Sequence, residues 1–198
     1  MDRTTAEEQK AAIGTCWVHV WKGDKVKSRL VVQGYAQHID DLDTTFASTP
    51  SLVTLKLLLT LSIVYSFVVR AGDISTAFLH AFMPEFERYF VWPPKEYYPL
   101  GGVLWRLRRA LYGLRNSPKL WQDHFASVML TLGFQRLKAD PNFYVKHSSR
   151  LYVLCYVDDL LVVGPPKEAD WFMQTLAQHV LLKDTGTLSE TQSITFLG

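Results

Sequence analysis

LYVLCYVDDLLVVG, residues 151–164, places two adjacent aspartates, Asp158 and Asp159, between two almost wholly apolar runs. Residues 151–157 and 160–163 are rich in β-branched, aromatic and aliphatic side chains, which predicts two core strands joined at the Asp-Asp step. Two like charges at the tip of a buried hairpin repel each other, and a divalent cation would relieve that repulsion. The alternative is an ordinary turn, because aspartate side chains hydrogen-bond their own backbone.

A third carboxylate, Asp73, ends an apolar segment over residues 67–73 that predicts another strand. If this strand neighbours the 151–164 hairpin in one sheet, three carboxylates converge on one edge. Such a set suits two Mg²⁺ ions, since hard cations prefer oxygen ligands, and two-metal sites carry out in-line phosphoryl transfer. Taken alone, Asp73 could equally be a strand-end turn residue.

The remaining pattern predicts an α+β fold, with an antiparallel sheet and helices on one face. Residues 15–21 and 25–36 alternate like a hairpin around Lys22-Gly23-Asp24, and Ser51 is a good N-cap for a helix over 51–64. Four prolines make residues 82–102 largely loop, followed by a strand and turn over 103–113. Helices are predicted over 117–132 and 167–181, and a last strand over 194–198.

Composition favours a soluble globular protein. The chain has 198 residues, 48% of them hydrophobic, which is enough for one large domain or two packed lobes. Cys16 and Cys155 are too few and too far apart for a disulfide framework or a zinc site, so a reducing compartment is expected. The N-terminus lacks a secretory segment, and polar residues interrupt the apolar run 52–69, which favours a core helix over a membrane span.

The net charge of +2 hides two basic stretches. Residues 100–122 contain no acid and carry five positive charges, at Arg106, Arg108, Arg109, Arg115 and Lys119. A second patch is diluted only by Asp24 and comprises Lys22, Lys25, Lys27 and Arg29. Such stretches suit phosphate-bearing partners, although a solvated surface is the alternative for any one of them.

Seven blocks, in order, resemble the reverse transcriptase domain of copia-type long-terminal-repeat retrotransposons over residues 16–198. They are KSRLVVQGYAQ, DTTFASTPSLVTLKLLLTLS, GDISTAFLHA, RLRRALYGLRNSPKLW, LGFQRLKADPNFYV, YVDDLLVVG and KDTGTLSETQSITFLG. Departures from the family pattern are Ser48 in place of proline, Trp92 in place of glutamine, and Ala71-Gly72 in place of bulkier residues before Asp73. None of them removes a carboxylate.

The resemblance implies a right-hand polymerase palm with partial fingers and an absent or incomplete thumb. It places fingers at about 16–65 and 80–112 and palm at about 66–79 and 113–198, after a poorly defined leader over 1–15. The matching catalytic and metal-binding residues are Asp73, Asp158 and Asp159, with two Mg²⁺ ions, or Mn²⁺, as cofactors. The matching nucleotide-binding residues are Lys27, Arg29, Phe78 and Gly113. Those matching nucleic-acid contacts are Arg106, Arg108, Arg109, Arg115, Ser117 and Lys119.

The implied activity is RNA-directed DNA polymerisation, in which a primer 3′-hydroxyl is extended with deoxynucleotides on an RNA or DNA template. Implied partners are the RNA template, the DNA primer, dNTPs, and the integrase and ribonuclease H of the same polyprotein, with no membrane. The implied location is a cytoplasmic virus-like particle, with nuclear access as a further option. Two rival hypotheses are a catalytically inactive nucleic-acid-binding remnant and a nucleotidyl cyclase. The block ALYGLRNSP argues against the cyclase.

Overall fold

A computed structural model describes residues 10–37, 45–85, 89–97 and 103–197. The chain divides into two compact units, called here unit 1 and unit 2. Unit 1 comprises Met1–Phe46 and Phe78–Trp121, and unit 2 comprises Ala47–Ala77 and Gln122–Gly198. Each unit contains its own β-sheet, so the architecture is a mixed α+β fold with two sheets.

Unit 2 is built on a six-stranded sheet in the order β10-β3-β9-β8-β7-β6, in which every neighbouring pair is antiparallel. The strands are β3 Val68–Ile74, β6 Gln135–Arg136, β7 Phe143–Lys146, β8 Leu151–Tyr156, β9 Asp159–Gly164 and β10 Leu182–Thr187. β8 and β9 are buried along most of their length, as their apolar sequence predicts. The predicted core hairpin is therefore confirmed.

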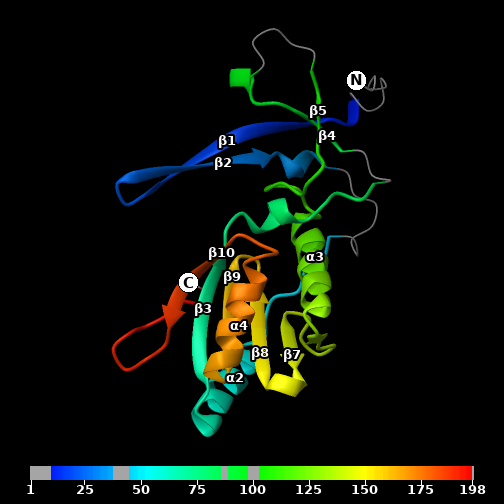
Figure 1. Cartoon of the computed structure of the whole chain (residues 1–198). Helices are drawn as coiled ribbons and strands as arrows, with labels where there is room; N and C mark the ends of the chain where they lie inside the picture. The colour runs from blue at the N-terminus through cyan, green and yellow to red at the C-terminus, as the bar shows by residue number, and fades with distance from the viewer. Residues whose placement is uncertain (1–9, 38–44, 86–88, 98–102, 198) are drawn as a thin grey trace. The chain divides into compact units, whose positions relative to one another are not determined.

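Helices cover both faces of this sheet, so the prediction of helices on one face is wrong. The helices are α2 Leu52–Tyr65, α3 Ser117–Thr131 and α4 Pro166–Leu176. Val69 of β3 packs in one cluster with Leu58 of α2, whereas the next residue, Arg70, pairs with Asp170 of α4. Successive strand residues point to opposite faces, so α2 and α4 lie on opposite sides of the sheet, as Figure 1 shows. The sequence pattern predicts which segments are helical but does not tell which face each helix covers.

Helix α2 begins as predicted, with the Ser51 hydroxyl accepting a hydrogen bond from the Val53 amide at 3.1 Å. The helix ends at Tyr65, and the next residue, the C-cap Ser66, adopts a left-handed conformation. Its buried residues are Thr54, Leu58 and Ser62, and most of its other apolar side chains are exposed. None of the helices in the described ranges is long and apolar enough to cross a membrane.

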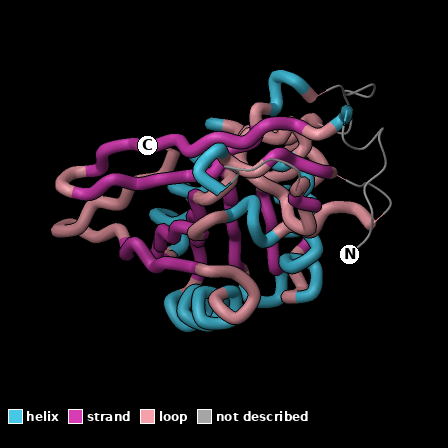
Figure 2. Tube along the Cα trace, turned by 90° about the horizontal axis from the view of Figure 1, so that it is seen from above, coloured by secondary structure: helices cyan, strands magenta, loops and turns pink. Residues whose placement is uncertain are grey.

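Unit 1 contains a four-stranded sheet in the order β2-β1-β4-β5. The strands are β1 Ile13–Lys22, β2 Lys25–Val32, β4 Phe90–Trp92 and β5 Trp105–Arg106. β1 and β2 form the predicted long hairpin, visible side by side in Figures 1 and 2. β4 pairs parallel with β1, so this sheet is not wholly antiparallel, and β4 lies in a segment predicted as loop. Phe90 and Val91 of this strand are buried, so their burial favours strand structure here despite the two prolines that follow Trp92.

The C-terminal part differs most from prediction. α4 ends at Leu176, five residues earlier than predicted, and β10 follows in a polar segment that has little strand pattern of its own. Residues 194–197 form no strand, although Ile194 and Phe196 still pack against the cluster that contains Leu58. The apolar side chains of this segment are packed, as expected, but the prediction that the segment forms a strand is wrong.

Candidate active site

The β8–β9 turn consists of Val157 and Asp158, because β8 ends at Tyr156 and β9 begins at Asp159. The predicted turn at Asp158-Asp159 is therefore displaced by one residue. Val157 has a φ of 53°, which is unusual for a β-branched residue. As a result, Asp158 occupies the turn itself, and Asp159 is held in the register of a strand.

Asp73 lies directly opposite Asp159 in the antiparallel pairing of β3 with β9. Opposed residues of an antiparallel pair project from the same face, with Cβ atoms about 5 Å apart. Asp158 is fixed to the same place by its carbonyl oxygen, which accepts a hydrogen bond from the Ile74 amide at 2.7 Å. The structure thus confirms that these strands are neighbours and brings the three predicted carboxylates to one end of the sheet.

Burial raises the pKa of Asp159 above its ordinary value. The Leu197 amide donates a hydrogen bond to Asp159 Oδ2 at 3.1 Å and lowers the pKa, whereas the charges of Asp158 and Asp73 raise it. The Ser75 hydroxyl donates to Asp73 Oδ2 at 3.3 Å. Negative charge is thus concentrated at this end of the sheet, where a cation would be stabilised.

The donor type fits magnesium, because carboxylate oxygens are the ligands that hard divalent cations prefer. Within the described ranges, however, no group of three or more histidine, cysteine, aspartate and glutamate side chains is arranged to hold a metal ion. Asp73, Asp158 and Asp159 are therefore neighbours with suitable chemistry, and they do not form a ready-made metal cage.

Two further residues share this row of the sheet and were missed from the sequence. Lys183 of β10 is the cross-strand partner of Asp73, and Tyr156 of β8 is the partner of Asp159. Lys183 was missed because β10 was not predicted, whereas Tyr156 follows from the hairpin register once the turn is placed correctly.

Cys155 is a buried neighbour of the carboxylates, on β8. Burial raises the pKa of its thiol, and the charges of Asp158 and Asp159 raise it further, so the thiol stays protonated. Its sulfur lies 3.8 Å from the Val157 carbonyl oxygen. Both Cys16 and Cys155 are free, as the sequence predicts.

In unit 1, two predicted nucleotide-binding residues contact the same tyrosine. The ring centres of Phe78 and Tyr112 lie 4.9 Å apart, and the Arg29 guanidinium lies 5.6 Å from the Tyr112 ring centre. Lys27 lies on the same face of β2 as Arg29 and is exposed. Tyr112 was missed from the sequence, because a lone tyrosine before a glycine carries no functional signal.

Gly113 has a φ of 92° and lies against the end of β2, where the Val32 amide donates to the Tyr112 carbonyl at 2.8 Å. A Cβ atom at this position would overlap the Val32 carbonyl oxygen. Glycine is therefore required here because the backbone at position 113 lies very close to the backbone of Val32. Its role in nucleotide binding stays a prediction.

Several residues of the basic segment have structural contacts. Arg115 donates to the carbonyl oxygens of Gly34 at 3.1 Å and Tyr35 at 3.5 Å. Ser117 is fully buried, and its hydroxyl donates to the Leu111 carbonyl at 2.7 Å. Its contact with nucleic acid stays a prediction. Arg106, Arg108 and Arg109 are exposed, and Lys119 is half-buried.

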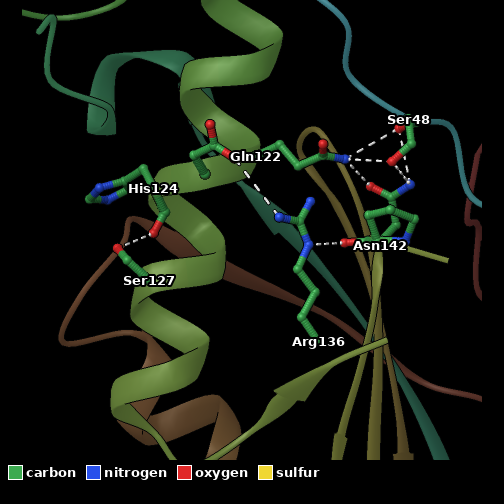
Figure 3. A network of polar contacts seen from close by, with 8 residues as sticks. Ser48, Gln122, His124, Ser127, Arg136 and Asn142 are labelled. Carbon is green, nitrogen blue, oxygen red and sulfur yellow. Dashed lines mark hydrogen bonds and ion pairs between the residues drawn. The ribbon is translucent and has the colours of Figure 1, made fainter. Parts of the chain in front are cut away.

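Ser48 belongs to a polar network in unit 2 that the sequence did not predict (Figure 3). Gln122 Nε2 donates to Asn142 Oδ1 at 2.8 Å and to Ser48 Oγ at 2.9 Å, and Asn142 Nδ2 donates to Ser48 Oγ at 3.1 Å. A proline at position 48 would lack this hydroxyl, so the departure from the family pattern has a structural use here. The Asn142 carbonyl also accepts from the Cys155 amide at 3.0 Å, which ties the network to β8.

The chain belongs to the reverse transcriptase (RNA-dependent DNA polymerase) family, whose family model matches residues 4–198. It is 32% identical over 164 residues to the Retrovirus-related Pol polyprotein from transposon TNT 1-94 of Nicotiana tabacum, covering 76% of this chain and 12% of that protein. It is 29% identical over 186 residues to the corresponding polyprotein from transposon RE1 of Arabidopsis thaliana, covering 87% of this chain and 12% of that protein. The resemblance to copia-type Pol polyproteins is confirmed.

A solved structure, of telomerase from Candida albicans in complex with a fragment of telomeric RNA, aligns over 98% of this chain and 45% of that chain. The TM-score is 0.49 and the sequence identity is 10%. Family membership rests on the sequence match alone.

Proposed function

We propose that the chain is the polymerising part of a copia-type retrotransposon reverse transcriptase. The reaction is attack of a primer 3′-hydroxyl on the α-phosphate of a deoxynucleoside triphosphate, with release of pyrophosphate, on an RNA or DNA template. The observation that carries the proposal is the strand register, which places Asp73 opposite Asp159. The Asp158 carbonyl lies beside this pair and accepts a hydrogen bond from the Ile74 amide. Membership of the reverse transcriptase family supports it.

In this proposal unit 2 is the palm and unit 1 is the fingers. The bounds differ from those expected from the sequence chiefly at α2, which belongs to unit 2 together with β3 and β9. A palm needs a rigid sheet to hold carboxylates in place, and the buried strands β8 and β9 provide one.

Asp73, Asp158 and Asp159 would hold two Mg²⁺ ions, or Mn²⁺. Bound there, such ions activate the attacking hydroxyl and neutralise the leaving pyrophosphate. The chain's own residues bind and orient the nucleotide: Lys27 and Arg29 would face the triphosphate, and Phe78 would exclude a 2′-hydroxyl beneath the sugar. The Tyr112 ring contacts both Arg29 and Phe78, next to Gly113 in the chain.

The proposed partners are an RNA template, a DNA primer and dNTPs, with integrase and ribonuclease H supplied by the same polyprotein. Relatives that are Pol polyproteins support the last point, since this chain spans 12% of the first two of them. The proposed location is a cytoplasmic virus-like particle with access to the nucleus. Arg106, Arg108, Arg109, Arg115 and Lys119 are the proposed sources of charge for nucleic-acid binding.

Primer extension on an RNA template tests the proposal. Asp158→Asn should lower Mg²⁺-dependent extension by roughly a thousandfold or more, because it removes a charge that a two-metal reaction requires. Asp123→Asn is the matched control in the same unit, since Asp123 is exposed and lies 3.8 Å from Arg136. Undiminished extension by Asp158→Asn would refute the assignment of the site.

The inactive nucleic-acid-binding remnant stays as the second candidate because the described residues contain no ready-made metal group. This candidate predicts salt-sensitive binding of template and primer by the unmodified chain, without extension at any Mg²⁺ or Mn²⁺ concentration. Extension that depends on Asp158 eliminates it.

A further inference from the structure

A cavity of about 500 Å³ opens in unit 1. It is formed by the segment that follows the short helix Ala77–His80 and by the strand segment that begins at β5. Its lining residues are Phe82, Met83, Pro84, Glu85, Arg106, Leu107 and Arg108. The lining combines apolar side chains with two cations and one carboxylate.

Backbone pairing fixes the two walls of this cavity. Phe82 forms an antiparallel bridge with Arg109, and the Met83 amide donates to the Arg108 carbonyl at 3.0 Å. Leu107 packs against the core cluster of unit 1 that contains Met83. Because side chains alternate along an extended segment, Arg106 and Arg108 both project away from that core.

An aromatic ring at the cavity is held in place by a stacked arginine. The Arg109 guanidinium lies 3.6 Å from the ring centre of Phe82, and its Nη1 donates to the His80 carbonyl at 2.6 Å. Arg109 is thereby fixed in position, while Phe82 remains 63% exposed. An exposed, pre-positioned ring of this kind is a surface on which another flat group can stack at little entropic cost.

The charges of the other two arginines are available. Arg106 and Arg108 are exposed, and neither side chain forms a hydrogen bond or ion pair with another described residue. Glu85, also exposed, is the carboxylate of the lining. Two guanidinium groups against one carboxylate favour an anionic ligand, and guanidinium binds phosphate in a bidentate manner.

We propose that this cavity binds one unpaired nucleotide of a single-stranded nucleic acid. Arg106 and Arg108 would bind the phosphates on either side of that nucleotide, its base would stack on Phe82, and Glu85 would accept hydrogen bonds from a base amino group or a ribose hydroxyl. An acidic peptide could satisfy the arginines, but it offers no flat group for the ring. The inference deepens the proposed function, on which it rests for its choice of a nucleic-acid partner.

Equilibrium binding without metal or dNTPs tests the arginines. The full chain is titrated against a fluorescent single strand of about 12 nucleotides, as RNA and as DNA, over roughly 50 to 200 mM salt. Arg106→Gln and Arg108→Gln should each raise the dissociation constant about three- to tenfold and reduce the salt slope by about 0.7. Arg150→Gln, which removes an exposed arginine of unit 2, is the control and should change neither.

Phe82→Leu tests stacking, because leucine retains apolar bulk and lacks the ring. It should weaken binding by at least about fivefold and abolish the fluorescence quenching of a 2-aminopurine placed in the oligonucleotide. Phe46→Leu, at a phenylalanine that is 70% exposed, should do neither. Unchanged binding by Phe82→Leu, equal losses in Arg150→Gln, or displacement of the oligonucleotide by polyglutamate at equal charge concentration would each overturn the proposal.

This assay separates two kinds of failure. If the chain extends primers but the cavity variants bind like the unmodified protein, the cavity assignment is wrong and the polymerase assignment stands. If the cavity variants lose binding but the unmodified chain never extends a primer, the cavity assignment stands and the polymerase assignment is wrong.

Discussion

The two units of this chain place their candidate functional residues in different ways. In unit 2, Asp73 and Asp159 lie at the ends of regular, buried strands, and their positions follow from the register of an antiparallel sheet. In unit 1, Arg29, Phe78 and Tyr112 come from a strand, a short helix and an irregular turn, and they meet through ring contacts. Strand pairing therefore sets the geometry in unit 2, whereas side-chain and backbone packing sets it in unit 1.

This difference predicts where each unit is sensitive. Unit 2 depends on burying apolar side chains between its sheet and its helices, and unit 1 depends on the close approach of backbone segments around Gly34 and Gly113. Substitutions that add an atom should therefore damage unit 1 most, and substitutions that remove atoms should damage unit 2 most.

The largest effect is expected at Gly113. Gly113→Ala should lower the free energy of unfolding by about 4 kcal/mol, the combined cost of a positive φ and a Cβ that overlaps the Val32 carbonyl. Gly23→Ala is the matched control, since Gly23 also has a positive φ but no atom lies within 4 Å of the added Cβ, so about 1 kcal/mol is expected. Urea denaturation measures both, and equal losses would contradict the packing role of Gly113.

A smaller loss is expected in unit 2, where Leu58 of α2 is completely buried against the sheet. Leu58→Ala should cost about 3 kcal/mol through lost burial and a cavity. Ile63, on the same helix but 81% exposed, provides the control, and Ile63→Ala should change stability by less than about 0.5 kcal/mol. If the two variants unfold at the same urea concentration, α2 does not pack on the sheet as described.

The smallest effect is a pH dependence at Asp159. Because its pKa is raised in the folded protein, protonation favours the folded state, and the charged carboxylate destabilises it as the pH rises through that raised value. Asp159→Asn should therefore be more stable than the unmodified protein at neutral pH in EDTA, with the difference vanishing below an unfolded-state pKa of about 3.9. Asparagine can still accept the Leu197 hydrogen bond. If Asp159→Asn is less stable than the unmodified protein at pH 7, the charge of Asp159 does not destabilise the folded state.

The sequence predicted those elements whose side-chain pattern is strong. The hairpins β1–β2 and β8–β9 and the helices α2 and α3 carry clear alternation or clear caps, and the three carboxylates followed from where the apolar runs end. β10 was missed because LKDTGT is polar and becomes a strand through its pairing with β3, which is also why Lys183 was missed. The turn was misplaced by one residue because Val157 adopts a backbone conformation that its propensity disfavours.

Contacts between segments far apart in the chain were beyond prediction. Ser48 meets Gln122 and Asn142 across 74 and 94 residues, and no local pattern indicates that the hydroxyl of a serine in a loop will accept hydrogen bonds from both side chains. The same holds for Tyr112, whose ring contacts Arg29 and Phe78 on other elements of unit 1. Sequence patterns specify elements, and packing decides which side chains share a site.

In the proposed function, Asp73, Asp158 and Asp159 hold divalent cations together, and titration with Mn²⁺ followed by electron paramagnetic resonance measures that binding. The unmodified chain should bind Mn²⁺, and Asp73→Asn should weaken that binding by about tenfold or more, since ligand charge sets affinity. Asp123→Asn should leave it unchanged. Mn²⁺ binding that survives Asp73→Asn at full affinity would contradict the claim, because Asp73 would then face Asp159 without sharing its ion.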